Sequence, residues 1–168
     1  MIVVINGALG VGKSETAWAL LSRFDRAVML DGDYLGAVRP FDIDDPARTQ
    51  YLYKTIGQLI EWHQTNGYRN FVINYVFEAP AELARLLNEL KPFDTRPHVV
   101  WLSCAEAEHM ARIERRNHDD VDRERHRARE LRTIMQNAAS TGWLGDKFDT
   151  TALSATEVAE AIYRKMVR

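Results

Sequence analysis

The sequence has little cysteine, no long apolar run and no surplus of positive charge. Its single cysteine, Cys104, cannot form an internal disulfide. No apolar run approaches the ~18 residues of a membrane-spanning helix, and no basic segment of the kind that opens a secretory signal accompanies the short apolar start "MIVVI". The formal net charge is -2, whereas proteins that coat nucleic acid are basic. We therefore expect a cytoplasmic protein that does not span a membrane and for which nucleic acid is an unlikely partner.

Two motifs of large nucleotide-hydrolase classes are also missing. GTP-binding switches normally carry an N-K-x-D motif that reads the base, and the sequence has none. Large ATPase machines normally end a second strand with paired acids. The nearest candidate, "FVINYVFE", has Asn74 where the first acid is expected. Both classes are disfavoured.

The chain of 168 residues alternates between strand-like and helix-like segments, which favours an α/β fold. Its length and its 46% hydrophobic content predict one domain, residues 1–168, with a single core. The expected strands are residues 1–6, 26–33, 70–77, 97–104 and about 147–153. Intervening helices predict a five-stranded parallel sheet that is covered on both faces.

Helix boundaries are marked by capping residues. Asp45 is a typical N-cap and Gly67 a typical end for one helix, while Ser154 and Glu157 form a capping box before the final helix. A charged region over residues 105–136 reads as helical, with a break near "RNHDDVD". The break suggests a lid that can close over a ligand.

The stretch "VINGALGVGKSET" contains the motif G-x-x-x-x-G-K-S as Gly7, Gly12, Lys13 and Ser14. Glycines let backbone N–H groups wrap round a phosphate at a helix N-terminus. Lys13 is predicted to reach the β- and γ-phosphates, and Ser14 to bind Mg²⁺. The residues expected to contact the nucleotide are Gly7, Ala8, Leu9, Gly10, Val11, Gly12, Lys13, Ser14, Glu15 and Thr16. Because the motif follows a strand and opens a helix, it predicts a P-loop NTPase fold.

Two carboxylates follow the second predicted strand in "MLDGDYLG". Ligands bind at the carboxyl ends of strands in open α/β sheets, so Asp31 and Asp33 are expected to face the phosphate loop. Asp31 is predicted to act at the Mg²⁺ site, and Asp33 to accept the proton of an attacking hydroxyl. The alternative is a turn in which both side chains only bind local backbone.

Eight arginines lie between residues 112 and 132. Arg112 and Arg116 are four residues apart and share one helix face, so they are predicted to neutralise charge on the transferring phosphoryl group. The proposed lid spans roughly residues 112–130. The alternative is a solvated helix held by pairs such as Glu108 with Arg112, and for residues 123–132 this alternative is favoured.

These motifs resemble the small P-loop kinases of the nucleoside-monophosphate-kinase-like group, over nearly the whole chain. "DGD" is similar to adenylylsulfate kinase and gluconate kinase, and the group includes shikimate kinases. The opening "INGALGVGKSETAWAL" looks like tunicamycin-resistance-type proteins and chloramphenicol phosphotransferase. The resemblance implies that Asp33 is the base or orients the acceptor. It also implies that Arg112 and Arg116 are lid arginines and that residues 150–155 lie near the adenine of ATP.

The resemblance has two departures, Asn74 in place of an acid and no following G-x-P-R pattern. A nucleoside monophosphate is therefore a poorer candidate acceptor than a small hydroxylated molecule. The candidate acceptor contacts are Asp33, Tyr34, Arg39, Tyr75 and Glu78. Arg39 suits an anionic group of the substrate, although it equally suits a surface position before a proline.

The sequence thus predicts an ATP- and Mg²⁺-dependent phosphotransferase that moves the γ-phosphoryl group to a hydroxyl of a small molecule, a metabolite or an antibiotic. One alternative is an ATP-binding module that sequesters a ligand or regulates a partner without turnover. Another is a nucleotide or polynucleotide kinase. No motif in residues 35–64 identifies the acceptor, and none predicts an oligomeric state.

Overall fold

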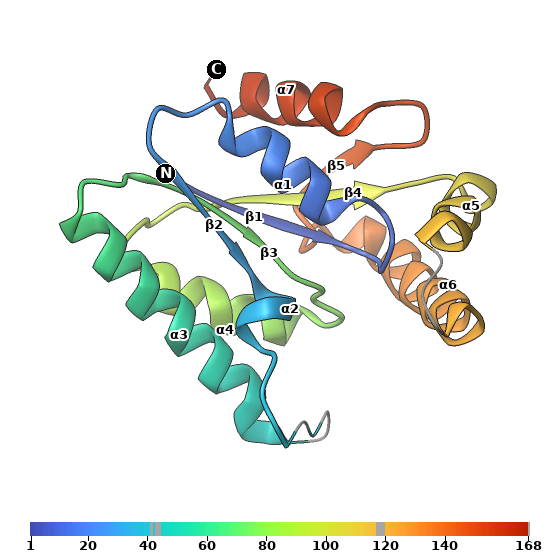
Figure 1. The fold of residues 1–168 in the computed structure, drawn as a ribbon, viewed down its shortest axis with the longest axis horizontal. Helices are drawn as coiled ribbons and strands as arrows, with labels where there is room; N and C mark the ends of the chain where they lie inside the picture. Colours follow the sequence, from blue (N-terminus) through green and yellow to red (C-terminus); the bar gives the residue numbers. More distant parts are fainter. Residues whose placement is uncertain (41, 43–44, 117–119, 168) are drawn as a thin grey trace.

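A computed structural model describes residues 1–40, 42, 45–116 and 120–167, and its centre is a sheet of five parallel strands (Figure 1). The strands are β1 (Ile2–Gly7), β2 (Ala27–Asp31), β3 (Asn70–Asn74), β4 (His98–Ser103) and β5 (Asp146–Asp149). Their order across the sheet is β2-β3-β1-β4-β5, and each neighbouring pair is parallel. The expected five-stranded parallel α/β sheet is confirmed.

Seven α-helices and one short 3₁₀ helix occur in the described residues. They are α1 (Lys13–Leu21), α2 (Gly32–Leu35), α3 (Pro46–Thr65), α4 (Pro80–Leu90), α5 (Glu106–Arg116), α6 (Val121–Ala138), η1 (Ala139–Thr141) and α7 (Ala155–Met166). Helices α1 and α7 cover one face of the sheet and α3 and α4 the other, while α5 and α6 lie beyond the carboxyl end of β4 (Figure 1).

The central strand β1 is buried on both faces, as its unbroken apolar sequence predicts. Val3 and Ile5 belong to the core formed with α1 and α7, and Ile2 and Val4 to the core formed with α3 and α4. Because its side chains alternate between the two faces of the sheet, β1 contributes to both cores. β1 is also the central strand, so the glycine-rich loop that follows Gly7 begins at the middle of the sheet.

The third strand is shorter than the sequence suggested, because β3 ends at Asn74 rather than at residue 77. The side chain of Asn6 binds the backbone of Phe77: its Oδ1 accepts from the Phe77 N–H at 3.0 Å and its Nδ2 donates to the Phe77 carbonyl at 3.2 Å. These bonds replace strand pairing and turn the chain out of the sheet. The predicted second strand likewise divides into β2 and the short helix α2, and the last strand ends at Asp149.

The predicted helix boundaries agree with the structure. The carboxylate of Asp45 accepts from the Ala47 N–H at 2.8 Å, and Ser154 and Glu157 form the expected capping box. The charged region is divided into α5 and α6, and Asp120 caps α6. Residues 117–119, where the helix break was predicted, lie outside the described residues. Within the described part of the chain, no helix is both long and apolar enough to span a membrane.

Candidate active site

The carboxyl ends of three neighbouring strands form the base of the site. Strand pairing places Asn74 of β3 beside Ile5 of β1 and beside Asp31 of β2. The glycine-rich loop leaves β1 at Gly7 and leads into α1, so its residues lie over the same edge of the sheet. Segments far apart in the sequence thus meet at one place, as the open α/β sheet predicts.

The loop has the backbone conformation that its glycines allow. Gly10 has a φ of 79° and Gly12 a φ of 101°, both left-handed, and Gly12 caps α1 without any side chain. A Cβ atom at Gly10 would lie 2.8 Å from the side chain of Ile113 in α5, so that position also lacks space for a larger residue. The N-terminus of α1 is consequently open to an anion.

Lys13 is 7% exposed and folds back over the loop. Its Nζ donates hydrogen bonds to the carbonyls of Gly7 at 3.0 Å and Ala8 at 3.2 Å. Burial lowers the pKa of Lys13 to about 8, although the nearby carboxylates of Asp33 and Asp31 favour its charged form. Its two hydrogen bonds hold the amine at the loop. Its pKa of about 8 is closer to neutral pH than that of an ordinary lysine.

Asp31, at the end of β2, uses one carboxylate oxygen to cap α2 and the other to bind α1 and β3. Its Oδ1 accepts from the Asp33 N–H at 2.9 Å and caps α2, as the turn interpretation predicts. Its Oδ2 accepts from the Ser14 hydroxyl at 3.1 Å and from Nδ2 of Asn74 at 2.7 Å. The turn interpretation thus describes the contacts of Oδ1, and a role of Asp31 at a Mg²⁺ site stays a prediction.

The surroundings of Ser14 suit a magnesium ion. Mg²⁺ prefers oxygen ligands and keeps several from water and phosphate. The Ser14 hydroxyl and the Asp31 carboxylate are such ligands, and Oδ1 of Asn74 is buried without a hydrogen-bond partner in the structure. An acid at position 74 would repel Asp31 over the same 2.7 Å that the Asn74 amide bridges with a hydrogen bond. Asp31 would therefore supply the carboxylate for a magnesium ion beside Ser14.

Asp33 lies two residues further on, beside the phosphate loop. Partial burial raises the pKa of its carboxyl and Asp31 adds to this, while Lys13 and Arg116 oppose the shift. A raised pKa makes Asp33 a better proton acceptor than an ordinary surface carboxylate at the same pH.

Arg112 ties helix α5 to the phosphate loop and to the end of β5. Its Nη1 donates to the Val11 carbonyl at 3.2 Å and to the Thr150 hydroxyl at 3.0 Å, and its Nη2 donates to the Thr150 carbonyl at 2.6 Å. Its Nε donates to Glu108 at 2.9 Å, which is the pair named by the solvated-helix alternative. Arg116, one helical turn later, is exposed. The two arginines thus share a helix face but differ in how firmly they are held.

His109 is a further loop contact that the sequence did not reveal. It is buried in α5, and its Nε2 lies 2.6 Å from the Leu9 carbonyl. Since a carbonyl only accepts, Nε2 is the donor. Burial lowers the pKa of His109, and Arg132 and Arg112 add to the effect. A neutral ring therefore holds the Leu9 carbonyl, and no spacing rule in the sequence would have selected this histidine.

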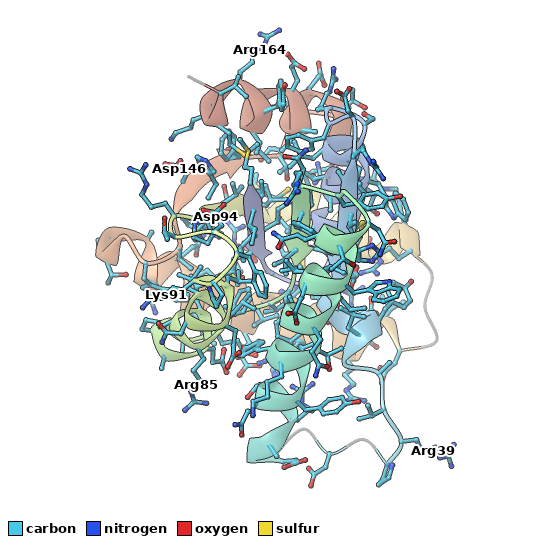
Figure 2. All side chains as sticks on the ribbon, turned by 90° about the vertical axis from the view of Figure 1, so that its left-hand side faces the viewer. Arg39, Arg85, Lys91, Asp94, Asp146 and Arg164 are labelled. Carbon is cyan, nitrogen blue, oxygen red and sulfur yellow. The ribbon has the colours of Figure 1, made fainter. Side chains whose placement is uncertain are left out.

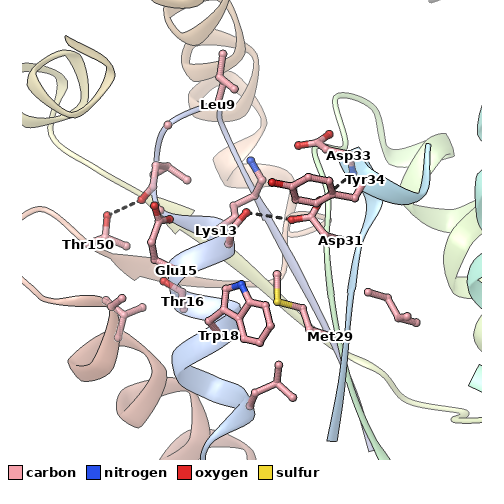
Figure 3. A pocket seen from close by; sticks show the side chains of 18 of the residues that line it. Leu9, Lys13, Glu15, Thr16, Trp18, Met29, Asp31, Asp33, Tyr34 and Thr150 are labelled. Carbon is pink, nitrogen blue, oxygen red and sulfur yellow. Dashed lines mark hydrogen bonds between the residues drawn. The ribbon is translucent and has the colours of Figure 1, made fainter. Parts of the chain in front are cut away.

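One cavity of about 1030 Å³ unites the loop with both aspartates (Figure 3). Residues 9–16, predicted to bind nucleotide, line it, and so do Asp31, Asp33, Tyr34, Arg112 and Arg116. Thr150 and Ala155 line its far end, on the side of α7. Figure 3 shows Thr150 on one side of the α1 N-terminus and Asp31, Asp33 and Tyr34 on the other. Gly7 and Ala8 lie beneath it, with their carbonyls on Lys13.

A second cavity of about 600 Å³ adjoins the first at Asp33. Arg39, Arg48 and Tyr75 also line it, and Nη2 of Arg48 donates to the Tyr75 hydroxyl at 3.4 Å. Arg39 is exposed, and its side chain extends away from the body of the protein (Figure 2). Arg48 was not singled out in the sequence, although it continues the i, i+4 row of Leu52 in α3. Glu78 lies elsewhere, in an ion pair with Arg127 of α6.

The parallel sheet order and the phosphate loop after β1 define a P-loop kinase-like domain. The chain belongs to the AAA domain family, whose model matches residues 2–140. No curated protein in the comparison matches the sequence.

Solved structures share the fold at low sequence identity. The tunicamycin resistance protein of Deinococcus radiodurans is 19% identical with a TM-score of 0.65, over 99% of this chain and 95% of that chain. Shikimate kinase of Acinetobacter baumannii, in complex with shikimate, is 18% identical with a TM-score of 0.61, over 98% and 92%. A gluconokinase of Sinorhizobium meliloti 1021 is 16% identical with a TM-score of 0.61, over 98% and 92%.

Proposed function

We propose that this protein transfers the γ-phosphoryl group of ATP, with Mg²⁺, to a hydroxyl group of a small molecule. The observation that carries the proposal is the position of Asp33, which lines both the cavity of the phosphate loop and the cavity beside it. A carboxylate at that junction can contact a hydroxyl from one side while the phosphate lies on the other. A protein that only binds a nucleotide would not require a second cavity beside Asp33.

The loop residues would hold the triphosphate. Lys13 would exchange its two backbone carbonyls for oxygens of the β- and γ-phosphates, and Ser14 with Asp31 would hold Mg²⁺. Mg²⁺ bound there would neutralise charge on the phosphate oxygens. Arg112 would position the loop against the base side of the cavity, and Arg116 would lie near the phosphates. We infer these roles from the hydrogen bonds of each residue and from its place in the cavity wall. Replacement of each residue is expected to cause a different kinetic defect.

The acceptor hydroxyl oxygen would attack the γ-phosphorus, and the bond from that phosphorus to the β–γ bridging oxygen would break. The electron pair of this bond leaves with ADP, and the hydroxyl proton passes to the carboxylate of Asp33. The raised pKa of Asp33 suits this step, since a base is most effective when its pKa approaches the working pH. Atoms and charge balance without any further reactant.

The acceptor belongs to the class of small hydroxylated molecules, metabolites or antibiotics. Arg48 and Tyr75 in the second cavity can donate hydrogen bonds to hydroxyl or anionic oxygens. The names of two solved structures of the same fold, a shikimate kinase and a gluconokinase, support this class. A nucleotide or polynucleotide acceptor would instead give ADP release with nucleosides, nucleotides or oligonucleotide ends.

The test is ADP release with a panel of hydroxylated metabolites and antibiotics, with the phosphorylated product identified by mass spectrometry. We expect Asp33→Asn to lower kcat by about 10²- to 10⁴-fold with little change in the KM for ATP, the range of a lost general base. Asp25→Asn, an exposed aspartate, is the matched control. Unchanged turnover in Asp33→Asn would exclude Asp33 as the base. Nucleotide-dependent ligand binding without any ADP would instead identify a binding module.

A further inference from the structure

The cavity of the phosphate loop extends well beyond the space that phosphates need. Its volume of about 1030 Å³ is at the upper end for a site that encloses a drug-sized ligand. From Asp33 it continues between α1 and β2 as a groove with an apolar lining. We call this groove the α1–β2 trench, and its lining residues are Trp18, Leu21, Val28, Met29, Tyr34 and Tyr68.

Two aromatic side chains of the trench, Trp18 and Tyr34, are largely exposed, whereas Tyr68 is half-buried. Trp18 is 67% and Tyr34 81% exposed. The core-facing apolar residues of α1 are Ala17 and Leu20, and Trp18 is not part of the core cluster that they form with the sheet. Large aromatic side chains left in water beside a cavity are a common sign of a ligand surface. Figure 3 shows Trp18 and Met29 next to each other below Lys13.

The trench begins at the reacting groups. Trp18 follows Ser14 by one turn of α1, and Tyr34 directly follows Asp33 in α2. A molecule with its hydroxyl at Asp33 therefore meets this apolar wall within a few bonds. The second cavity, with Arg48 and Tyr75, leads from Asp33 in a polar direction. The two directions divide the surroundings of the acceptor into a polar and an apolar part.

The trench is also open along its length. β2 is the outermost strand of the sheet, and its only strand neighbour in the described structure is β3. The groove between β2 and α1 consequently has an open outer side, and a chain longer than the cavity can continue into solvent.

We propose that the α1–β2 trench binds an apolar arm of the acceptor, so that the acceptor is an amphipathic alcohol with an acyl, alkyl or aromatic group next to the hydroxyl-bearing part. This rests on the proposed function, since it takes Asp33 as the place of the hydroxyl. Trp18 and Met29 contact the arm, and Tyr34 lies between the arm and the hydroxyl. The inference concerns binding and requires no further chemical step.

The test uses straight-chain primary alcohols, 1-butanol, 1-hexanol and 1-octanol, with a non-hydrolysable ATP analogue present. Dissociation constants come from isothermal titration calorimetry, which also serves variants without Trp18, and the NMR signals of the tryptophan indole N–H groups, assigned with single variants, report where the alcohol binds. We expect 1-octanol to bind about tenfold more tightly than 1-butanol, because each CH₂ group in a half-open groove contributes part of its transfer free energy. The Trp18 signal should shift. The Trp62 signal should stay, since Trp62 lies on α3 and is 65% exposed but does not line this cavity.

Trp18→Ala should remove most of the gain with chain length, and Trp62→Ala should leave it intact. Equal affinity for all three alcohols, or a chain-length gain that survives in Trp18→Ala, would overturn the proposal. A dimer that dissociates in Trp18→Ala would also overturn it, because the trench would then bind protein. Binding is measured without turnover, so these results are separate from the ADP assay. Chain-length-dependent binding without ADP release in any assay would refute the kinase and retain the apolar site.

Discussion

The two ends of the main cavity differ in how their side chains are held. At the phosphate end, Lys13, Ser14 and Arg112 each have hydrogen bonds to backbone or to another side chain. At the trench end, Trp18 and Tyr34 are exposed and packed on one side only. The phosphate end is arranged before any ligand binds, whereas the trench end gains most of its contacts from the ligand. Affinity for nucleotide and affinity for acceptor should therefore respond to different substitutions.

The largest expected effect is that of Lys13→Ala. Loss of the amine that binds the Gly7 and Ala8 carbonyls should lower kcat/KM for ATP by about 10²- to 10³-fold, the range for one preorganised charge donor. Steady-state ADP release measures it, with Lys54→Ala on the exposed side of α3 as control. The same variant should bind 1-octanol as wild type does. A parallel loss of alcohol binding would show that the two ends are not independent.

A smaller effect is expected from Arg112→Ala, which removes the contacts to Val11 and Thr150. The KM for ATP should rise about tenfold, since a hydrogen bond from a charged group contributes roughly 1.5–3 kcal/mol. Arg115→Ala is the control, because Arg115 binds the same Glu108 carboxylate and lines the same cavity but, among the described residues, forms no hydrogen bond with the loop. Equal effects of the two substitutions would assign the role to the ion pair with Glu108 rather than to the loop contact.

The smallest effect is the pH dependence of nucleotide binding. The pKa of Lys13 is lowered to about 8, so its positive charge is complete below that pH and is lost above it. Affinity for ADP should fall by about fivefold as pH rises from 8 to 9, while 1-octanol binding stays constant. Isothermal titration calorimetry gives both. A constant ADP affinity to pH 9.5 would mean that Lys13 keeps an ordinary lysine pKa in the protein.

The phosphate end could be predicted from sequence because its residues are close together in the chain. The motif from Gly7 to Ser14 requires only a strand, a turn and a helix, and "LDGD" requires only the next strand end. The parallel sheet could be predicted because short apolar runs alternate with segments whose apolar residues have helical spacing. Asn74 was noticed as a missing acid, yet its hydrogen bond to Asp31 depends on β2 and β3 being neighbours, which no local pattern specifies.

The trench and the second cavity could not be predicted in this way. Trp18 has the same local pattern as a residue that packs a helix, and its exposure beside the edge strand β2 is visible only in the folded chain. Arg48 precedes Leu52 by four residues in α3, and nothing in its local sequence marks it as a residue that lines a cavity. His109 reaches Leu9 across 100 residues of sequence, so its role appears only when α5 is placed against the loop. Such contacts depend on tertiary packing rather than on spacing.

The hydrogen bonds of Lys13 to the Gly7 and Ala8 carbonyls have a consequence for the speed of binding. The loop is already curved at the left-handed Gly10 and Gly12, and rotation of the Lys13 side chain would release its amine from the two carbonyls. Under the proposed function, capture of ATP would need a side-chain rearrangement, which takes about nanoseconds, rather than the folding of a loop, which is slower. Encounter between protein and nucleotide, not reorganisation of the loop, should set the association rate.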